Sequence, residues 1–319
     1  MHIIHLKQFL EISFNMLVSV IIPTYNRKDL LKDAINSVLN QSYNHFEVII
    51  VDDLSNDGTK DFILGLKNKK IKYICNKKKL YAAQSRNVGI NYSNGDLIAF
   101  LDDDDIWLAS KLEKQVKLFD DKNVGFVYSG TTLFFENYNI SYNTKPILKG
   151  RIYKDMLINN YIGATPSVVV RKVALLECLE KKQYFDNLFI AREEYDLWIR
   201  LSKKWKVDFV SEPLVKQYYR NNINRISSNV YSYVKANDLL DSKYAKDIEI
   251  RLTKKERTQR LSVQSFFLGS QAIKINNSKL ARKYYLEAFK TNKNIKSFLI
   301  YFACFFGAKF VVKLRCYFK

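Results

Sequence analysis

Histidine, cysteine and proline are scarce in this chain of 319 residues, which contains three, four and four of them. With so few histidines, acid–base catalysis would fall to carboxylates. The cysteines are scattered and have no CxxC pair or other spacing typical of a metal site, so we expect free thiols in a reducing compartment. They are Cys75, Cys178, Cys304 and Cys316.

Neither end of the sequence has the pattern of a leader or of a membrane span. Residues 1–15 show no basic stretch before a long apolar core and no small-residue cleavage site, so we expect a short extension there. Phe298–Phe306 is strongly apolar but shorter than the roughly 20 residues that cross a bilayer. With Lys309, Lys313 and Arg315 close behind it, this stretch is typical either of a helix on a membrane surface or of a core helix.

Basic residues are abundant. Lys and Arg outnumber Asp and Glu by 52 to 32, which gives a net charge of +20 and a pI of about 9.6. Such a charge favours anionic partners, namely nucleic acid, nucleotide-sugars or an anionic membrane surface. The basic residues are spread along the chain and accompany no recognisable nucleic-acid module, which argues against nucleic acid. The hydrophobic content of 47% is ample for a buried core.

Strands and helices alternate in the first hundred residues. Short β-branched runs bounded by turns predict buried strands, and apolar residues at helical spacing predict helices between them. The strands are expected at 17–22, 46–51, 71–74 and 97–101, and the helices at 30–39, 60–67 and 82–90. This alternation predicts an α/β fold with a mostly parallel central sheet and helices on both faces.

The pattern is less regular after residue 110. We expect a helix at 111–119, paired strands at 125–128 and 131–135, a polar mobile loop at 137–149, a strand at 167–170, a helix from Arg192, and two strands at 207–210 and 215–219 around Pro213. Residues 230–319 are rich in Lys, Tyr and Phe and contain no proline. They predict a helical C-terminal region.

Four consecutive aspartates, Asp102–Asp105, follow the predicted strand at 97–101. Adjacent anions repel one another unless a cation lies between them, and such oxygen ligands suit Mg²⁺ or Mn²⁺. The alternative is a solvated acidic turn that caps the next helix, for example through Asp105. Because ligands of parallel sheets bind beyond the carboxyl ends of the strands, the aspartates should meet Pro23–Arg27 and Asp52–Asp53 at one edge. That convergence favours a binding site.

Five motifs in the same order make the sequence similar to glycosyltransferase family 2. They are Val18–Asn26, Val51–Thr59, Arg86–Gly89, Phe100–Trp107 and Glu193–Trp198. Members are inverting enzymes with the Rossmann-like GT-A fold. The resemblance implies this fold over residues 16–228, with a nucleotide-binding half at 16–110 and an acceptor half at 111–228. Residues 1–15 would be an N-terminal extension and 229–319 a basic helical region.

The resemblance implies a nucleoside diphosphate sugar across the strand ends. The matching residues are Pro23, Thr24, Tyr25, Asn26, Asp53, Arg86, Asp102, Asp103 and Asp104. The first four would line the base and ribose, and Asp53 would accept a hydrogen bond from the base. Asp102 and Asp103 would help to hold the ribose and metal, Asp104 would bind Mn²⁺ or Mg²⁺, and Arg86 would bond to aspartate or phosphate. Without the resemblance, Asp53 could equally be a carboxylate that stabilises a turn. Arg86 could be a solvated arginine on a helix surface.

The acceptor side of the family pattern usually carries Glu-Asp, with the aspartate as catalytic base, whereas this chain has Glu193-Glu194. The resemblance makes Glu194 the base, with one extra methylene. The pair alone is also typical of acidic residues in the first turn of a helix. The segments that contain Arg220 and Arg225 resemble the loop that closes over the diphosphate in this family. A solvated basic loop would have a similar sequence.

The resemblance implies transfer of a sugar to a hydroxyl of a glycan or lipid-linked acceptor in surface-polysaccharide or lipopolysaccharide synthesis, and the expected donor is a UDP-sugar. It further implies a cytoplasmic enzyme that is peripheral on the inner face of the membrane. The replacement at Glu194 leaves a non-catalytic sugar-binding or scaffold protein as the alternative. The sequence indicates no oligomeric state.

Overall fold

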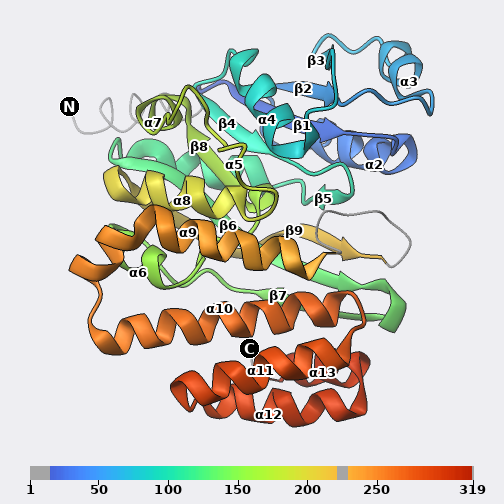
Figure 1. Ribbon diagram of the computed structural model, residues 1–319. Helices are drawn as coiled ribbons and strands as arrows, with labels where there is room; N and C mark the ends of the chain where they lie inside the picture. Colours follow the sequence, from blue (N-terminus) through green and yellow to red (C-terminus); the bar gives the residue numbers. More distant parts are fainter. Residues whose placement is uncertain (1–14, 221–228, 318–319) are drawn as a thin grey trace, which may run out of the picture.

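The computed structural model describes residues 15–220 and 229–317. It contains a nine-stranded sheet with strand order β3-β2-β1-β4-β8-β6-β9-β5, and β7 pairs with β6 beside this path. Figure 1 shows the sheet surrounded by helices in the upper part of the molecule, with the C-terminal helices stacked below it. The predicted α/β fold with a helical C-terminal region is confirmed.

The N-terminal half is a parallel sheet. Its strands are β1 (Val18–Thr24), β2 (Phe46–Asp52), β3 (Ile71–Cys75) and β4 (Leu97–Phe100). Its helices are α2 (Lys28–Leu39), α3 (Thr59–Gly65) and α4 (Tyr81–Asn91). All residues of β1 and β4 are buried, as expected for parallel strands covered on both faces. The parallel register brings the carboxyl ends of these strands to one edge.

The second half of the sheet is mixed. Its strands are β5 (Asp105–Trp107), β6 (Val124–Phe135), β7 (Ile140–Thr144), β8 (Val168–Arg171) and β9 (Lys206–Tyr219). The helices that follow β5 along the chain are α5 (Lys111–Val116), α6 (Tyr153–Ile158), α7 (Lys172–Glu177) and α8 (Glu193–Lys204). Three 3₁₀ turns lie at Lys117–Asp120, Glu136–Tyr138 and Thr165–Ser167.

Three local expectations are wrong in this half. The strand pairs expected at 125–135 and at 207–219 are two continuous strands, β6 and β9, which pair with each other in parallel. Gly130 lies opposite Pro213, and the register shifts there absorb both residues without ending either strand. The expected loop at 137–149 contains β7, which pairs with β6. Asp105 belongs to β5 and accepts a hydrogen bond from Gln217 at 2.9 Å, so it does not cap the next helix.

The C-terminal region is helical, as expected. It consists of α9 (Val230–Arg251), α10 (Lys254–Lys274), α11 (Ser278–Asn292), α12 (Ile295–Ala303), a 3₁₀ turn at Cys304–Phe306 and α13 (Ala308–Arg315). Thr253 and Glu256 form a capping box at the start of α10. None of the helices in the two described ranges is apolar over a length that could span a membrane.

Three clusters of buried apolar side chains stabilise the molecule. Two lie on either face of the sheet, and the cluster that includes Trp198 of α8 also contains Ala236, Leu240 and Tyr244 of α9. The third cluster lies between α10, α11, α12 and α13 and reaches Phe135 at the end of β6. The first C-terminal helix therefore shares a core with the helix that begins at Glu193.

Candidate active site

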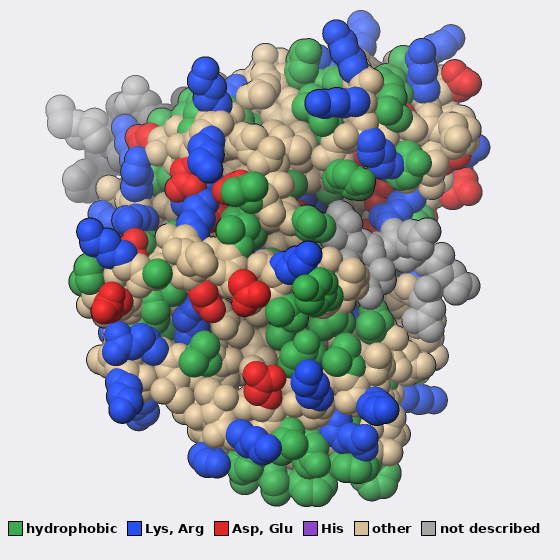
Figure 2. Space-filling model, in the orientation of Figure 1, with side chains coloured by type: hydrophobic (Ala, Val, Ile, Leu, Met, Phe, Trp, Pro, Cys, Tyr) green, Lys and Arg blue, Asp and Glu red, His purple; other side chains and the backbone are tan. Residues whose placement is uncertain are grey.

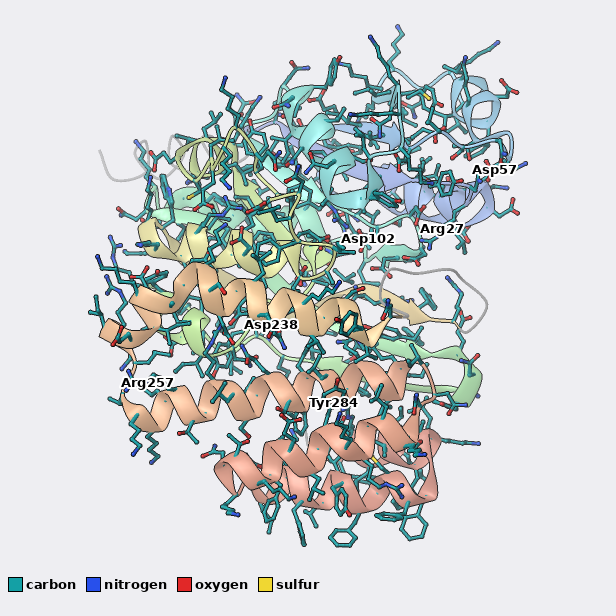
Figure 3. All side chains as sticks on the ribbon, viewed as in Figure 1. Arg27, Asp57, Asp102, Asp238, Arg257 and Tyr284 are labelled. Atoms are coloured by element: carbon teal, nitrogen blue, oxygen red, sulfur yellow. The ribbon has the colours of Figure 1, made fainter. Side chains whose placement is uncertain are left out.

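The acidic loop after β4 meets the turn after β1 at the carboxyl edge of the sheet. Arg27 donates from Nη1 to Asp103 Oδ1 at 2.9 Å and lies 3.4 Å from Asp104 Oδ2. Thr24 Oγ1 donates to Asp103 Oδ2 at 2.9 Å. Figure 3 labels Arg27 and Asp102, which reach this edge from the two loops. The predicted convergence of β1 and β4 is confirmed, and the aspartates are not a solvated turn.

A shared cation is the main electrostatic feature of this loop. Burial raises the pKa of the Asp103 carboxyl to about 6, Arg27 opposes this rise, and the charge of Asp104 adds to it. Asp103 and Asp104 are only 5% and 8% exposed, and they present their oxygens to one guanidinium nitrogen. Two buried carboxylates around one positive charge form a donor set that fits Mg²⁺ or Mn²⁺. Sequence reasoning placed Arg27 at this edge but gave it no role in the site.

Arg86 of α4 connects the acidic loop to α8. Its Nη2 donates to Asp102 at 2.6 Å and its Nη1 donates to Glu193 at 2.9 Å. Burial alone would lower the pKa of this guanidinium, but the charges of Asp102 and Glu193 outweigh burial and raise it. The Nε atom is buried with no hydrogen-bond partner in the described ranges. Arg86 is therefore an interior bridge between two segments far apart in sequence, and not a solvated helix arginine.

Glu193 and Glu194 open α8, as the sequence predicted. Glu194 is half-buried, and burial together with the negative charge of Glu193 raises the pKa of its carboxyl to about 7, while Arg192 and Arg86 act in the opposite direction. A carboxyl with a pKa near neutrality is suited to general-base catalysis. An interaction with the helix dipole alone would favour the ionised carboxylate and lower its pKa, whereas the pKa of Glu194 is raised.

Asp53 is 4% exposed and accepts three hydrogen bonds from the protein. Its Oδ1 accepts hydrogen bonds from Asn76 Nδ2 at 2.9 Å and from the Leu80 amide at 2.7 Å, and its Oδ2 accepts one from the Tyr81 amide at 2.8 Å. A carboxylate has about four acceptor positions, so one remains for a ligand. The segment before α4 thus fixes the orientation of Asp53, which sequence spacing alone did not reveal.

The four residues of the β1 turn differ in their surroundings. Pro23 is buried within β1, and Thr24 is committed to Asp103. Tyr25 is exposed, and the Lys79 ammonium lies over its ring. Asn26 adopts a left-handed φ of 50° and accepts a hydrogen bond from the Asn56 amide at 2.8 Å. Of these side chains, Tyr25 is the one that presents a broad surface to solvent beside the acidic loop.

Comparison with known proteins now identifies the family. The sequence model described as Glycosyl transferase family 2 matches residues 19–179, which is half of the chain. The chain belongs to glycosyltransferase family 2. The match ends before Glu193 and Glu194, so the assignment of the base depends on the geometry of α8.

Glycosyltransferases from several bacteria are similar to this family 2 glycosyltransferase over most of their length. The Escherichia coli protein WfgD, a UDP-Glc:alpha-D-GlcNAc-diphosphoundecaprenol beta-1,3-glucosyltransferase, is 32% identical over 69% of this chain and 83% of its own. The putative teichuronic acid biosynthesis glycosyltransferase TuaG of Bacillus subtilis is 31% identical over 69% of this chain and 84% of its own. An uncharacterized glycosyltransferase of Haemophilus influenzae is 28% identical over 94% of this chain and 99% of its own.

Solved GT-A glycosyltransferases have a similar fold. S. aureus TarS 1-349 in complex with UDP-GlcNAc superposes with a TM-score of 0.54 at 17% identity, over 90% of each chain. The mannosyltransferase PcManGT from Pyrobaculum calidifontis, in complex with GDP-Man and Mn²⁺, superposes with a TM-score of 0.57 at 16% identity, over 88% of this chain and 80% of its own. At these identities the likeness concerns the fold alone.

Of the two arginines predicted to close over the diphosphate, the structure describes one, Arg220. Arg225 lies outside the described residues. Arg220 donates from Nε to both carboxylate oxygens of Glu136, at 3.0 and 2.9 Å, and its guanidinium lies 4.6 Å from the centre of the Tyr218 ring. Glu136 follows β6, so the structure joins Arg220 to the β6–β7 connection and not to the acidic loop.

The C-terminal helices of the glycosyltransferase contact the start of α8, which sequence reasoning missed. Arg192 precedes Glu193 with a left-handed φ of 61°. Its guanidinium hydrogen-bonds to Asn237 of α9 and lies 4.4 Å from the centre of the Phe267 ring of α10. Tyr233 of α9 lies within electrostatic reach, because the charge of Glu194 adds to burial in raising the pKa of its phenol. No local sequence pattern could predict these contacts, because they join segments that are 40 or more residues apart.

A second acidic cluster connects α8 to α9. Glu180, Asp186 and Asp196 have carboxylate oxygens within 4.8 Å of one another, a spacing that would admit an ion. The Lys243 ammonium lies 2.5, 3.3 and 2.7 Å from them. Asp196 is fully buried and also accepts hydrogen bonds from Arg200 at 2.9 Å and from Tyr244 at 2.8 Å. In this structure, Lys243 and Arg200 offset part of the negative charge of the cluster, and Lys243 holds α9 against α8.

Proposed function

We propose that this family 2 glycosyltransferase moves a sugar, with inversion, from a UDP-sugar to a hydroxyl of a lipid-linked glycan acceptor. The observation that carries the proposal is the position of Glu194. It has a pKa of about 7 and lies next to Glu193, which Arg86 connects to the acidic loop. A carboxylate prepared for proton transfer is thus connected, through Glu193 and Arg86, to an acidic loop that could hold the metal ion of a diphosphate.

Glu194 is the general base in this proposal. It accepts the proton of the acceptor hydroxyl while the hydroxyl oxygen forms a bond to the anomeric carbon. The bond from that carbon to the diphosphate oxygen breaks on the opposite face, and UDP departs with the electron pair. A base with a pKa near ambient pH is ionised in a useful fraction of molecules and still basic enough to take the proton. Glu193 is held by Arg86 at 2.9 Å, which leaves Glu194 as the carboxylate free for this role.

The donor side is assigned to the carboxyl edge of the sheet. Asp104, with Asp103, would hold Mn²⁺ or Mg²⁺, which when bound neutralises the charge of the departing diphosphate. Support comes from the two carboxylates around Arg27 and from the Mn²⁺ recorded with PcManGT. Asp53 would accept a hydrogen bond from the base with its remaining lone pair, and Tyr25 would cover the base or ribose.

The acceptor class is proposed from the relatives. WfgD and WfaP of Escherichia coli are both named for transfer from UDP-Glc to a GlcNAc-diphosphoundecaprenol, at 32% and 31% identity. A lipid-linked acceptor places the enzyme at the inner face of the cytoplasmic membrane. We expect the enzyme to act in surface-polysaccharide synthesis. The similarity to TuaG, a putative glycosyltransferase of teichuronic acid biosynthesis, supports this expectation.

The proposal is tested in two steps. A thermal-shift screen of nucleotide-sugars, with and without Mn²⁺, should give the largest rise in melting temperature with a UDP-sugar and the metal together. Transfer to a GlcNAc-diphospholipid should then fall about 100-fold or more in Glu194→Gln, with donor stabilisation unchanged. Full transfer by Glu194→Gln would overturn the assignment of the base.

The replacement of Asp by Glu at position 194 also motivates the alternative, a sugar-binding relative without catalysis. The two functions differ in donor hydrolysis. A transferase should hydrolyse its donor slowly in Mn²⁺, and Asp104→Ala should abolish this hydrolysis. A binding protein would be stabilised by the donor but would release no UDP at any enzyme concentration.

A further inference from the structure

The last two helices have one buried face and one exposed face. The buried residues are Ile300, Ala303, Cys304, Ala308, Val311 and Val312, which join the cluster formed by α10 and α11. The exposed residues are Ile295, Leu299, Phe302, Phe305, Phe306 and Phe310, which we call the aromatic face. The expectation of a core helix therefore holds for one side of this stretch, and the other side meets solvent.

The aromatic face is a continuous apolar surface and not a set of isolated residues. Phe305 and Phe306 are 56% and 73% exposed, and Ile295 is 70% exposed. Ring centres lie 6.3 Å apart for Phe302 and Phe305 and 5.2 Å apart for Phe306 and Phe310. A contiguous exposed patch of large apolar side chains usually marks a binding surface.

Positive charge surrounds the aromatic face. Residues 278–317 contain nine Lys and Arg, of which only Arg315 is buried, and one acid, Glu287. Arg282 lies 4.3 Å from the centre of the Phe305 ring. Figure 2 shows apolar side chains gathered at the lower edge of the molecule, with Lys and Arg on both sides.

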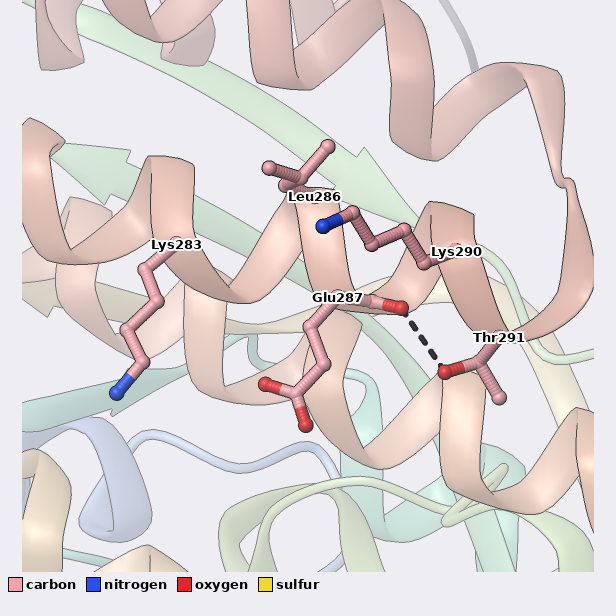
Figure 4. Close-up of a pocket in the computed structure, with 5 residues that line it drawn as sticks. All are labelled: Lys283, Leu286, Glu287, Lys290 and Thr291. Carbon is pink, nitrogen blue, oxygen red and sulfur yellow. Dashed lines mark hydrogen bonds between the residues drawn. The ribbon is translucent and has the colours of Figure 1, made fainter.

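A shallow hollow on α11 belongs to this basic border. Lys283, Leu286, Glu287, Lys290 and Thr291 line it, all from one helix (Figure 4). Thr291 Oγ1 donates to the Glu287 backbone oxygen at 2.9 Å. The charged side chains at the hollow are Lys283, Lys290 and Glu287. The hollow has no enclosed polar site, so we interpret it as part of the charged rim.

We propose that the aromatic face docks on the surface of an anionic lipid bilayer. Short helices with aromatic side chains on one side and lysines at the border lie in the headgroup region, and acidic lipids attract the lysines. A second copy of the chain fits less well, because a symmetric pairing would bring two basic borders together. The inference deepens the proposed function only in its lipid-linked acceptor, since docking requires no sugar transfer.

The test is flotation of the full chain with vesicles. Vesicles of phosphatidylethanolamine and phosphatidylglycerol should bind the protein, and phosphatidylcholine vesicles should bind it much more weakly. Replacing Phe305, Phe306 and Phe310 together with serine should lower the partition coefficient at least about tenfold. The matched control replaces Leu64, Ile147 and Ile250, which are 56%, 64% and 71% exposed elsewhere, with serine and should bind as the unaltered chain does.

A charge pair separates the electrostatic contribution. Lys309→Glu with Lys313→Glu should lower binding to anionic vesicles at least about tenfold, and the same change at the exposed Lys60 and Lys69 should have a much smaller effect. High salt should weaken the unaltered chain in the same way. Donor stabilisation in the thermal-shift assay should remain in every variant, which shows that each one folds and tests the proposed function separately.

Two outcomes would overturn the proposal. One is equal binding by the aromatic-face and control variants. The other is absence of vesicle binding together with a dimer in solution that the three serine replacements convert to a monomer, which would assign the aromatic face to a second copy. A chain that binds vesicles but no nucleotide-sugar would overturn the proposed function and leave the docking surface standing.

Discussion

Glu193→Gln offers a direct test of the electrostatics at α8. The carboxylate of Glu193 lies beside Glu194, and its charge is the largest influence after burial in raising the pKa of Glu194 from the ordinary 4.5 to about 7. Glutamine keeps the shape but removes the charge. It also frees the guanidinium of Arg86, now 2.9 Å from Glu193, to interact more strongly with Glu194. Both changes favour the ionised form of Glu194, so its pKa should fall.

The size of the fall follows from the order of the causes. Burial is the larger one and remains in the variant, so the pKa of Glu194 should stay above its ordinary value, and we expect a decrease of about one pH unit. At pH ~6, a base with a pKa of about 7 is ~10% ionised and one with a pKa of about 6 is ~50% ionised. Since the ionised base is the active form, activity rises with pH through the pKa. Relative to its plateau, the variant should be about fivefold more active at pH ~6.

The assay is the initial rate of sugar transfer at saturating donor and acceptor, between about pH 5.5 and about pH 8.5. Glu287→Gln, which removes an exposed acid from α11, should leave the midpoint of the profile unchanged. A midpoint that stayed in place or moved upward in Glu193→Gln would refute the assignment of Glu194 as the titrating base. A lower plateau with the predicted midpoint would show that Glu193 also contributes to positioning.

Three other substitutions test further contacts of the structure. Asp104→Ala should reduce Mn²⁺-dependent donor hydrolysis about 100-fold or more while the protein stays folded. Lys243→Met removes the ammonium next to the fully buried Asp196 and should lower the free energy of unfolding by about 2 kcal/mol in urea, whereas Lys203→Met, at an exposed pair, should cost less than about 1 kcal/mol. Gly130→Ala should destabilise by more than about 1 kcal/mol, because its Cβ would lie 2.7 Å from a backbone oxygen of β7, and Gly65→Ala, with nothing within 4 Å, should not.

The N-terminal half was predictable because its signals are local. Each strand is an apolar, β-branched run, each helix has apolar residues at helical spacing, and parallel topology by itself brings Asp53 and Asp102–Asp104 to one edge. Family motifs supplied the roles. The donor side could therefore be located from sequence, apart from Arg27 and the amides that hold Asp53.

The failures occurred where distant residues cancel a local signal. Gly130 and Pro213 each resemble a strand end, yet they lie opposite each other in one irregular pair and neither strand stops. Asp105 resembles a helix cap, but it lies in β5 and accepts a hydrogen bond from Gln217 of β9, more than a hundred residues away. The pKa of Glu194 depends on burial by segments that no spacing in the sequence connects to it.

Arg86 gives the two halves of the candidate site a single reference point. One guanidinium binds Asp102 beside the donor edge and Glu193 beside the base, at 2.6 and 2.9 Å. A displacement of the acidic loop would be transmitted to α8, because Arg86 is buried and bonded to both. If it moved with one carboxylate, the other would lose its cation. The opposite side of α8 is fixed by Lys243, through Asp196, and by Asn237, through Arg192. The proposed base is therefore positioned from both sides, by the N-terminal half and by the C-terminal helices, so removal of residues 229–319 should lower the rate of sugar transfer as well as vesicle binding.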